Sequence, residues 1–176
     1  MTPTAYKYLD IGIGVGPISF VEFIIGDNRG NQIILHYGPW KALMDRRADI
    51  ERFVQATAAT TLTICNLSLQ IVNMRNETIV KLTSHDTSMY MKPSTLLFLF
   101  EIEHCVEHVY YQLYQTIHAV NDKYKYFVSI LRRNCVANKY DAMKLLRETY
   151  DKTSLTDCEL LVYASDNIVY DALHDK

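Results

Sequence analysis

Apolar and polar residues alternate along the first part of the chain and predict three strands. The stretches AYKYLDIGIGVG, ISFVEFII and QIILHY, at 5–16, 18–25 and 32–37, place β-branched and apolar residues at every second position. The glycines of the first stretch permit a bulge or a sharp bend. GDNRGN, between the second and third stretches, is typical of a turn because it combines Gly, Asp and Asn. The pattern therefore predicts three strands.

The period of the pattern changes after Gly38. Pro39 suits the first turn of a helix, where its missing N–H costs little. Beyond it, one face of the predicted helix is apolar and the opposite face is charged. The apolar face carries Trp40, Leu43, Ile50 and Val54, and the charged face carries Asp45, Arg46, Asp49 and Arg52.

The same order of elements then repeats. After the small and polar connector QATAATT, strands are predicted at 62–72, 78–84 and 89–91, separated by the turn sequences NMRNE and HDTS. A second helix is predicted from Pro93 to Ala119. Its apolar residues follow a 3-4 spacing that predicts a helix-packing seam, formed by Leu99, Ile102, Val106, Val109 and Leu113.

This repetition indicates an internal duplication. The two prolines lie 54 residues apart, and the matching stretches DIERFV and EIEHCV lie 52 residues apart. We therefore expect an α+β fold with three segments: a β-β-β-α unit at 1–57, a second at 61–120, and a mostly helical extension at 121–176. A single unit of this size would bury little apolar surface alone, so the two units should pack together.

The last third carries weaker signals. YKYFVSIL fits either a strand or a helix, whereas NKYDAMKLLRETYDK predicts an amphipathic helix. The stretch from 154 to 173 also predicts helix, with Ser154 as N-cap and Asp157 in the first turn.

Composition limits the class of protein. Of the 176 residues, 49% are apolar, which is enough for a core, and the formal net charge is -2. A strongly basic nucleic-acid binder would carry more positive charge, although charge can be segregated onto one face. The N-terminus lacks a signal-peptide pattern, and the longest apolar run, LLFLF, is too short to span a bilayer. These features predict an intracellular protein, nuclear or cytoplasmic, without a membrane partner.

The first helix start resembles that of a known family. ILHYGPWKALMDRRADIERFV is similar to the helix-start signature of the positive-cofactor-four-like (PC4-like) single-stranded-DNA-binding family. It shares the leucine of the last strand, the proline, the early tryptophan and the later DI. The second repeat keeps MKPSTLL and EIE without the tryptophan. The resemblance covers about two thirds of the chain.

The resemblance implies a fold and a function. Members of that family bind single-stranded DNA with curved antiparallel sheets, as dimers whose helices pack together, so two units in one chain would form an internal pseudo-dimer. The expected function is non-catalytic binding of single-stranded nucleic acid in transcription or replication. The expected contact residues combine cations with aromatic rings: Lys7, Tyr8, Arg29, Trp40, Lys41, Arg75, Lys81 and Lys92.

Three features leave alternatives open. Trp40 fits a base platform, as the resemblance implies, but also a packing residue at the edge of the core. Alternation predicts that Leu67, Leu69, Ile71, Val80 and Leu82 face inward, while Ser68, Gln70, Lys81 and Thr83 face outward. Such a polar outer face suits either solvent or a nucleic-acid backbone. The basic residues Arg132, Arg133, Lys139, Lys144 and Arg147 fit either a solvated helix face or an extension of a binding groove.

Catalysis, metals and cofactors are not expected. GIGVGP lacks the spacing of a phosphate loop, and a strand follows it where a helix would be needed. His104 and His108 share a helix face with Cys105 nearby, yet no third ligand is evident. The four cysteines form no CxxC pair. The alternative function is structural: self-association or docking of a protein partner through the long helix 93–119, which the near-neutral charge favours.

Overall fold

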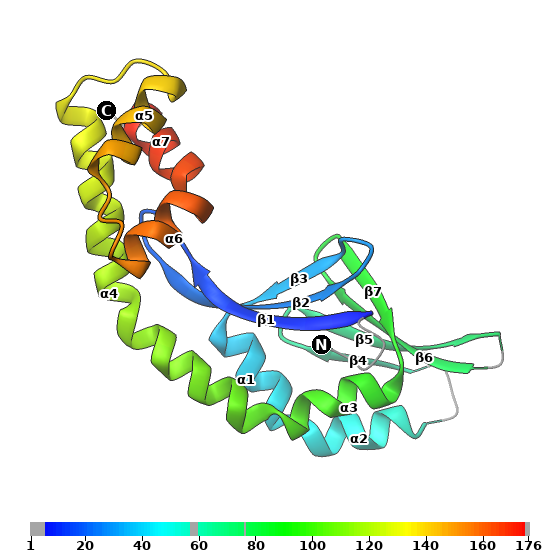
Figure 1. Ribbon diagram of the computed structural model, residues 1–176. Coiled ribbons are helices and arrows are strands. Elements are labelled where there is room, and N and C mark those ends of the chain that lie inside the picture. Colours follow the sequence, from blue (N-terminus) through cyan, green and yellow to red (C-terminus); the bar gives the residue numbers. More distant parts are fainter. Residues whose placement is uncertain (1–5, 57–59, 76, 175–176) are drawn as a thin grey trace. The chain divides into compact units, whose positions relative to one another are not determined.

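The computed structural model describes residues 6–56, 60–75 and 77–174 and confirms the α+β class (Figure 1). Two separate antiparallel sheets have the strand orders β1-β2-β3 and β4-β5-β6-β7. The elements follow the order β1 (Lys7–Gly14), β2 (Phe20–Asp27), β3 (Gln32–Leu35), α1 (Tyr37–Asp45), α2 (Arg47–Val54), β4 (Thr61–Ile64), β5 (Leu67–Met74), β6 (Glu77–Ser84), β7 (Thr87–Met91), α3 (Pro93–Glu101), α4 (Glu103–Arg133), α5 (Lys139–Thr149), α6 (Leu155–Tyr163) and α7 (Ser165–His174).

The chain divides into two compact units. The first, called here the sheet unit, comprises the described residues up to Gly12 and Val21–Gln112. The second, the helical unit, comprises Ile13–Phe20 and the described residues from Leu113 onward. This division follows packing, whereas the segments 1–57, 61–120 and 121–176 follow the repeated order of elements and remain a prediction.

The second sheet contains one strand more than expected. The stretch 62–72, predicted as a single strand, is divided into β4 and β5 by a two-residue turn, because Ile64 pairs with Leu67 and Cys65 adopts a left-handed φ of 52°. Arg75 and His85 begin the next two turns with φ values of 52° and 48°. The strand prediction was wrong here because Cys65 has no turn preference of its own.

Both repeats contribute to one core in the sheet unit. The inner faces of the two sheets and the apolar faces of α1, α2, α3 and the start of α4 form a single cluster of buried residues. Within it, β3 approaches β7, α1 approaches β4, and α2 approaches α3. The expectation that the two units pack together agrees with this shared core.

The helix predicted from 93 to 119 is in fact two helices, and that prediction was wrong. Ile102, with φ −98° and ψ 2°, ends α3, and α4 then runs on to Arg133. A straight helix of 27 residues would extend about 40 Å, whereas Leu96 and Phe100 before the break and Val106 after it are all buried in the same core. The change of direction lets both helices contribute to that core.

The first repeat has an equivalent break. Arg46, with φ −93° and ψ 18°, separates the nine-residue α1 from α2, and Ile102 follows the nine-residue α3. The two breaks are therefore equivalent positions. The stretches DIERFV and EIEHCV are not equivalent, since the first lies within α2 and the second spans the break at Ile102. The sequence match is shifted relative to the structural repeat.

The helical unit has its own core. The second half of α4 packs with α5, α6 and α7 through a buried cluster that includes Tyr124, Phe127, Leu131, Leu146 and Ile168. The stretch YKYFVSIL is helical. Ser154 caps α6 by accepting a hydrogen bond from the Asp157 N–H, as predicted. Asn138 caps α5 in the same way through Asp141.

The connection between β1 and β2 belongs to the helical unit. The Ser19 N–H donates to the Asn121 side chain over 3.0 Å, and the Asn167 side chain donates to the Val15 carbonyl over 3.2 Å. No helix within residues 6–56, 60–75 and 77–174 combines the length and apolar character needed to cross a membrane.

Candidate nucleic-acid surface

Trp40 lies in the core of the sheet unit. Its ring is fully buried and stacks on Phe23, with ring centroids 4.9 Å apart and planes 8° from parallel. Tyr110 continues the stack beyond Phe23 at 5.8 Å, and Tyr37 stacks on Tyr110 at 4.3 Å. The ring has no open face for a base, so the structure places Trp40 as a packing residue that joins α1 to β2.

Lys7 is also buried. Its ammonium lies 3.2 Å from the Asp27 carboxylate, and both side chains are almost completely excluded from solvent. Asp27 additionally accepts hydrogen bonds from the Arg29 N–H and from the main chain and side chain of Asn31. Burial opposes ionisation of Asp27, but these hydrogen bonds outweigh burial and lower its pKa to about 2. Lys7 therefore holds the β2–β3 turn to β1 and is not presented to a ligand.

Lys41 forms a cluster of ion pairs. Its ammonium donates to Glu107 over 3.0 Å and to Glu103 over 3.3 Å, and Asp45 lies 3.6 Å away. Hydrogen bonding to the two glutamates raises the pKa of Lys41. Because the carboxylates outnumber this cation, Lys41 ties α1 to α4 and offers little positive charge to a phosphate. Lys92 has a weaker pairing, since it lies 3.4 Å from Glu77 and both side chains are exposed.

The outer face of the β1–β3 sheet carries Tyr8. The Tyr8 ring lies directly over Gly26, where an added Cβ would fall 2.1 Å from the ring, and its hydroxyl accepts a hydrogen bond from the Gln32 side chain. The same face carries the carboxylates of Asp10 and Glu22. Arg29 is exposed in the adjoining turn. This face combines an aromatic ring with negative charge.

The outer face of the β4–β7 sheet is different, and it is called here the polar face. As alternation predicted, Leu67, Leu69, Ile71, Val80 and Leu82 are buried and the residues between them point outward. The strand register places the outward side chains in rows across the sheet, and beyond Gln70 and Lys81 the pairs Val72–Ile79 and Met74–Glu77 continue this face along β5 and β6. Two of the rows are polar. One row is Thr63, Ser68, Thr83 and Ser88, and the other is Thr61, Gln70, Lys81 and Tyr90.

Lys81 and Tyr90 are neighbours on this face, with Tyr90 on the edge strand β7. They are paired residues of β6 and β7, so their Cβ atoms are separated by about 5 Å. Tyr90 is 44% exposed, and Lys81 is half-buried and forms no ion pair with any described residue. Arg75 lies in the turn between β5 and β6. An unpaired cation beside an open aromatic ring is the combination that single-stranded nucleic acid requires.

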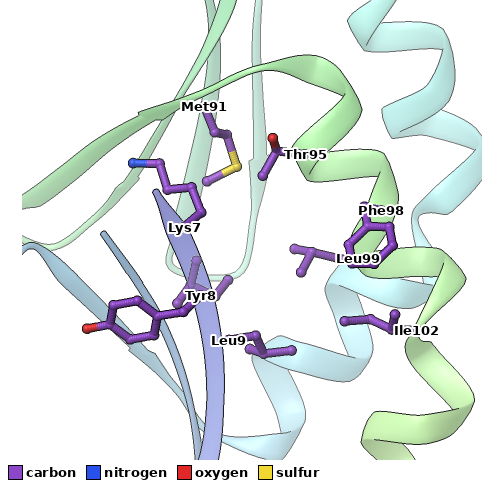
Figure 2. A pocket seen from close by; sticks show the side chains of 9 residues that line it. Lys7, Tyr8, Leu9, Met91, Thr95, Phe98, Leu99 and Ile102 are labelled. Carbon is purple, nitrogen blue, oxygen red and sulfur yellow. The ribbon is translucent and has the colours of Figure 1, made fainter. Parts of the chain in front are cut away.

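A small pocket lies in the sheet unit between β1 and α3 (Figure 2). Met91, Thr95, Phe98 and Leu99 line it, while Tyr8 points away from the helical wall of the pocket. Its volume of about 40 Å³ suits a few water molecules and not a nucleobase. The pocket therefore does not extend the polar face.

Sequence reasoning did not select Tyr90. A signal was present, because Met89 and Met91 are apolar and alternation places Tyr90 between them on the outer face. Its pairing with Lys81 depends on the two-residue turn at His85 and Asp86, which sets the register of β6 against β7. The predicted four-residue turn HDTS obscured that register.

The histidines of α4 do not form a metal site in the described part of the chain. His104 and Cys105 are exposed, and the His108 ring is hydrogen-bonded to Gln112 over 3.0 Å. Among the described residues, no three His, Cys, Asp or Glu side chains lie close enough together to hold a metal ion.

Comparisons with known proteins match no family model, no curated protein and no solved structure.

Proposed function

We propose that this protein binds single-stranded nucleic acid without catalysis, through the polar face of β4–β7, and that it acts in transcription or replication. The observation that carries the proposal is the pairing of Lys81 with Tyr90 on an outward sheet face. The resemblance of the helix start to the PC4-like family supports the same function, as does the repeated order of strands and helices. An internal pseudo-dimer of two PC4-like units is part of this proposal.

The chemistry of the polar face fits single-stranded nucleic acid better than a duplex. A base can stack on Tyr90, and such stacking contributes about 1–3 kcal/mol per base. Lys81, Arg75 and the solvent-exposed Lys92 can contact phosphates, and the hydroxyl and amide side chains of the two rows can donate hydrogen bonds to sugar and phosphate oxygens. A rigid duplex keeps its bases stacked inside and cannot place one on Tyr90.

A direct test compares single-stranded and duplex oligonucleotides by fluorescence anisotropy at low salt. The protein should prefer the single strand, and a Lys81→Ala, Tyr90→Ala double variant should bind at least tenfold more weakly. A Lys152→Ala, Tyr163→Ala double variant removes an exposed lysine and an exposed tyrosine of the helical unit; it is the matched control and should bind as the unchanged protein does. Equal affinity of the double variant and the control would refute the polar face as the binding surface.

The alternative function, assembly through the long helix, rests on a specific observation. Val109 and Tyr111 of α4 are 37% and 54% exposed. The first part of the predicted seam, however, is not available to a partner, because Leu99 and Val106 are buried in the core of the sheet unit. If this surface mediates assembly, the molar mass measured by light scattering should rise with protein concentration, and Val109→Asp should abolish the rise.

A further inference from the structure

We propose that the helical unit contains a separate binding site for a phosphate-bearing ligand, in a groove along the C-terminal half of α4. The groove, called here the α4 groove, is lined by Tyr124, Lys125, Ser129, Arg132, Arg133 and Asp171. All of these residues belong to the helical unit, so the site depends on that unit alone.

Helical spacing arranges the donors of the groove in a line. Lys125, Ser129 and Arg133 follow one another at intervals of four residues on α4, which places each about 6 Å from the next along the helix axis. A hydroxyl therefore lies between two cations on one strip of the helix. The Ser129 hydroxyl itself donates to the Tyr126 main-chain carbonyl over 2.8 Å, so the Lys125 ammonium and the Arg133 guanidinium are the groups of this strip that can donate hydrogen bonds to the oxygens of one extended anion.

The neighbouring polar groups of the groove are already engaged. The Tyr124 hydroxyl donates to the Asp171 carboxylate over 2.5 Å, and Arg132 donates to the Asp171 main-chain carbonyl over 2.8 Å. That carbonyl belongs to the last turn of α7, where intrahelical partners are lacking. Arg132 and Tyr124 thus position Asp171 and α7, while Lys125 and Arg133 remain available.

The charge of the groove is locally unbalanced. Elsewhere in the helical unit, Lys123 pairs with Asp157 over 3.0 Å and Lys139 pairs with Asp166 over 2.8 Å. Within the described residues, Lys125 and Arg133 form no such pairs, and the Asp171 carboxylate is the only acidic group among the residues that line the groove. A concave surface with an excess of one charge attracts ligands of the opposite charge.

Size and chemistry identify the class of ligand. The groove has a volume of about 430 Å³, within the range of sites for small molecules. Arginine forms paired hydrogen bonds with phosphate, and lysine adds a point charge. No aromatic ring in the groove is free to stack on a base, because Tyr124 is buried. The site therefore recognises phosphate groups, whether they come from a nucleotide or from a nucleic-acid backbone.

The experiment titrates the full chain with adenosine triphosphate at low salt and follows binding by calorimetry. We expect saturable binding that weakens at least tenfold in a Lys125→Ala, Arg133→Ala double variant and changes little in Ser129→Ala, because the Ser129 hydroxyl donates to the Tyr126 carbonyl. A Lys144→Ala, Lys152→Ala double variant removes two cations from the same unit outside the groove and should bind normally. Circular dichroism of each variant verifies that the helices are retained.

A second titration, with a short single-stranded oligonucleotide, distinguishes the two sources of phosphate. Loss of triphosphate binding with unchanged oligonucleotide binding assigns the groove to nucleotides, and loss of both assigns it to phosphate in either form. Absence of triphosphate and oligonucleotide binding by the unchanged protein, or equal binding by the groove and control variants, would overturn the proposal. The Lys81→Ala, Tyr90→Ala variant leaves the groove intact and should bind the triphosphate normally. Its oligonucleotide affinity therefore tests the proposed function separately from the groove.

Discussion

The two sheets of the sheet unit share an inner pattern and differ in their outer faces. In both, every second residue is buried against the common core. On the outer side, the β1–β3 sheet carries Asp10, Glu22 and a Tyr8 ring whose hydroxyl is bonded to Gln32. The β4–β7 sheet carries hydroxyl and amide side chains on one side of Lys81 and Tyr90, and Val72 and Ile79 on the other side of Lys81. The two sheets therefore bury the same kind of side chain and present different chemistry to a ligand.

The difference is also electrostatic. Burial raises the pKa of Glu22, with a smaller opposing contribution from His36. A carboxylate beside Tyr8 repels a phosphate backbone, whereas the carboxylate on the outward side of β6, Glu77, lies two rows from Lys81 and pairs with Lys92. We therefore expect the second sheet to bind and the first to contribute mainly stability.

The largest expected effect tests the shared packing. Counting from the equivalent breaks at Arg46 and Ile102, Trp40 corresponds to Leu96, and both side chains are fully buried. Trp40→Ala should lower the free energy of unfolding by about 3–5 kcal/mol and Leu96→Ala by about 2–5 kcal/mol. Urea denaturation followed by circular dichroism measures both. A loss below 1 kcal/mol for either would show that the repeats do not share one core.

The next effect should be confined to the first sheet. Asp27 ends β2, and the corresponding end of β6 is Ser84, which carries no charge. Asp27→Asn leaves Lys7 buried without its counterion and should cost about 3–5 kcal/mol at neutral pH. Ser84→Ala should cost about 1 kcal/mol, as is typical of a lost neutral hydrogen bond. Thermal denaturation of the two variants compares them directly.

Because Asp27 stabilises the fold in its ionised form, the stability of the protein should depend on pH. The pKa of Asp27 is about 2 in the folded protein and about 3.9 in an unfolded chain. The stability due to its ionised form is therefore complete above about pH 4 and is lost as the pH falls towards 2. Asp27→Asn should flatten the stability profile in this window. An unchanged acid profile would contradict the assignment of Asp27 as the stabilising carboxylate.

A smaller effect on oligonucleotide affinity should distinguish the outer faces of the two sheets. Tyr90→Ala should weaken binding of single-stranded oligonucleotides by about one stacking contribution, roughly 1–3 kcal/mol. Tyr8→Phe removes the hydroxyl that bonds Gln32 and keeps the ring, so affinity should not change. Anisotropy titrations measure both variants. Weaker binding by Tyr8→Phe alone would transfer the proposed site to the first sheet.

The smallest effect concerns salt. Each phosphate contact to a single strand contributes about 0.7 to the slope of log affinity against log salt concentration. Lys81→Ala should reduce the magnitude of that slope by about this amount, while Lys41→Met should leave it unchanged because its charge is balanced by Glu103 and Glu107. Affinities at four salt concentrations suffice. If Lys41→Met altered the slope and Lys81→Ala did not, the phosphate contact would belong to Lys41 and not to Lys81.

Local patterns predicted much of the fold. Alternation identified the strands and the inward residues of β5 and β6, and Ser154 was recognised as a cap because its partner is three residues away. The helix break at Ile102 was missed, since its cause is the position of a core built from distant residues. The turn at Cys65 was missed as well, although the sequence has Asn66, Asn76 and Asp86 at intervals of ten residues.

The candidate surface was less predictable, for a related reason. Whether a lysine is available depends on partners far along the chain, and Lys7 meets Asp27 while Lys41 meets Glu103 and Glu107. No short sequence pattern indicates those pairs. Lys81 was identified because alternation along a single strand is enough to place it outward.

The two hydrogen bonds that hold the β1–β2 connection also constrain the order of folding. They join positions 102 and 152 residues apart in sequence, whereas the strands of the β4–β7 sheet are linked by two-residue turns. Contacts between distant positions slow folding, because a long loop must close before they form. During synthesis, the β4–β7 sheet can form as soon as it emerges, but the helical unit needs Asn167 near the end of the chain to meet Val15 near its beginning. The helical unit is therefore completed after the β4–β7 sheet.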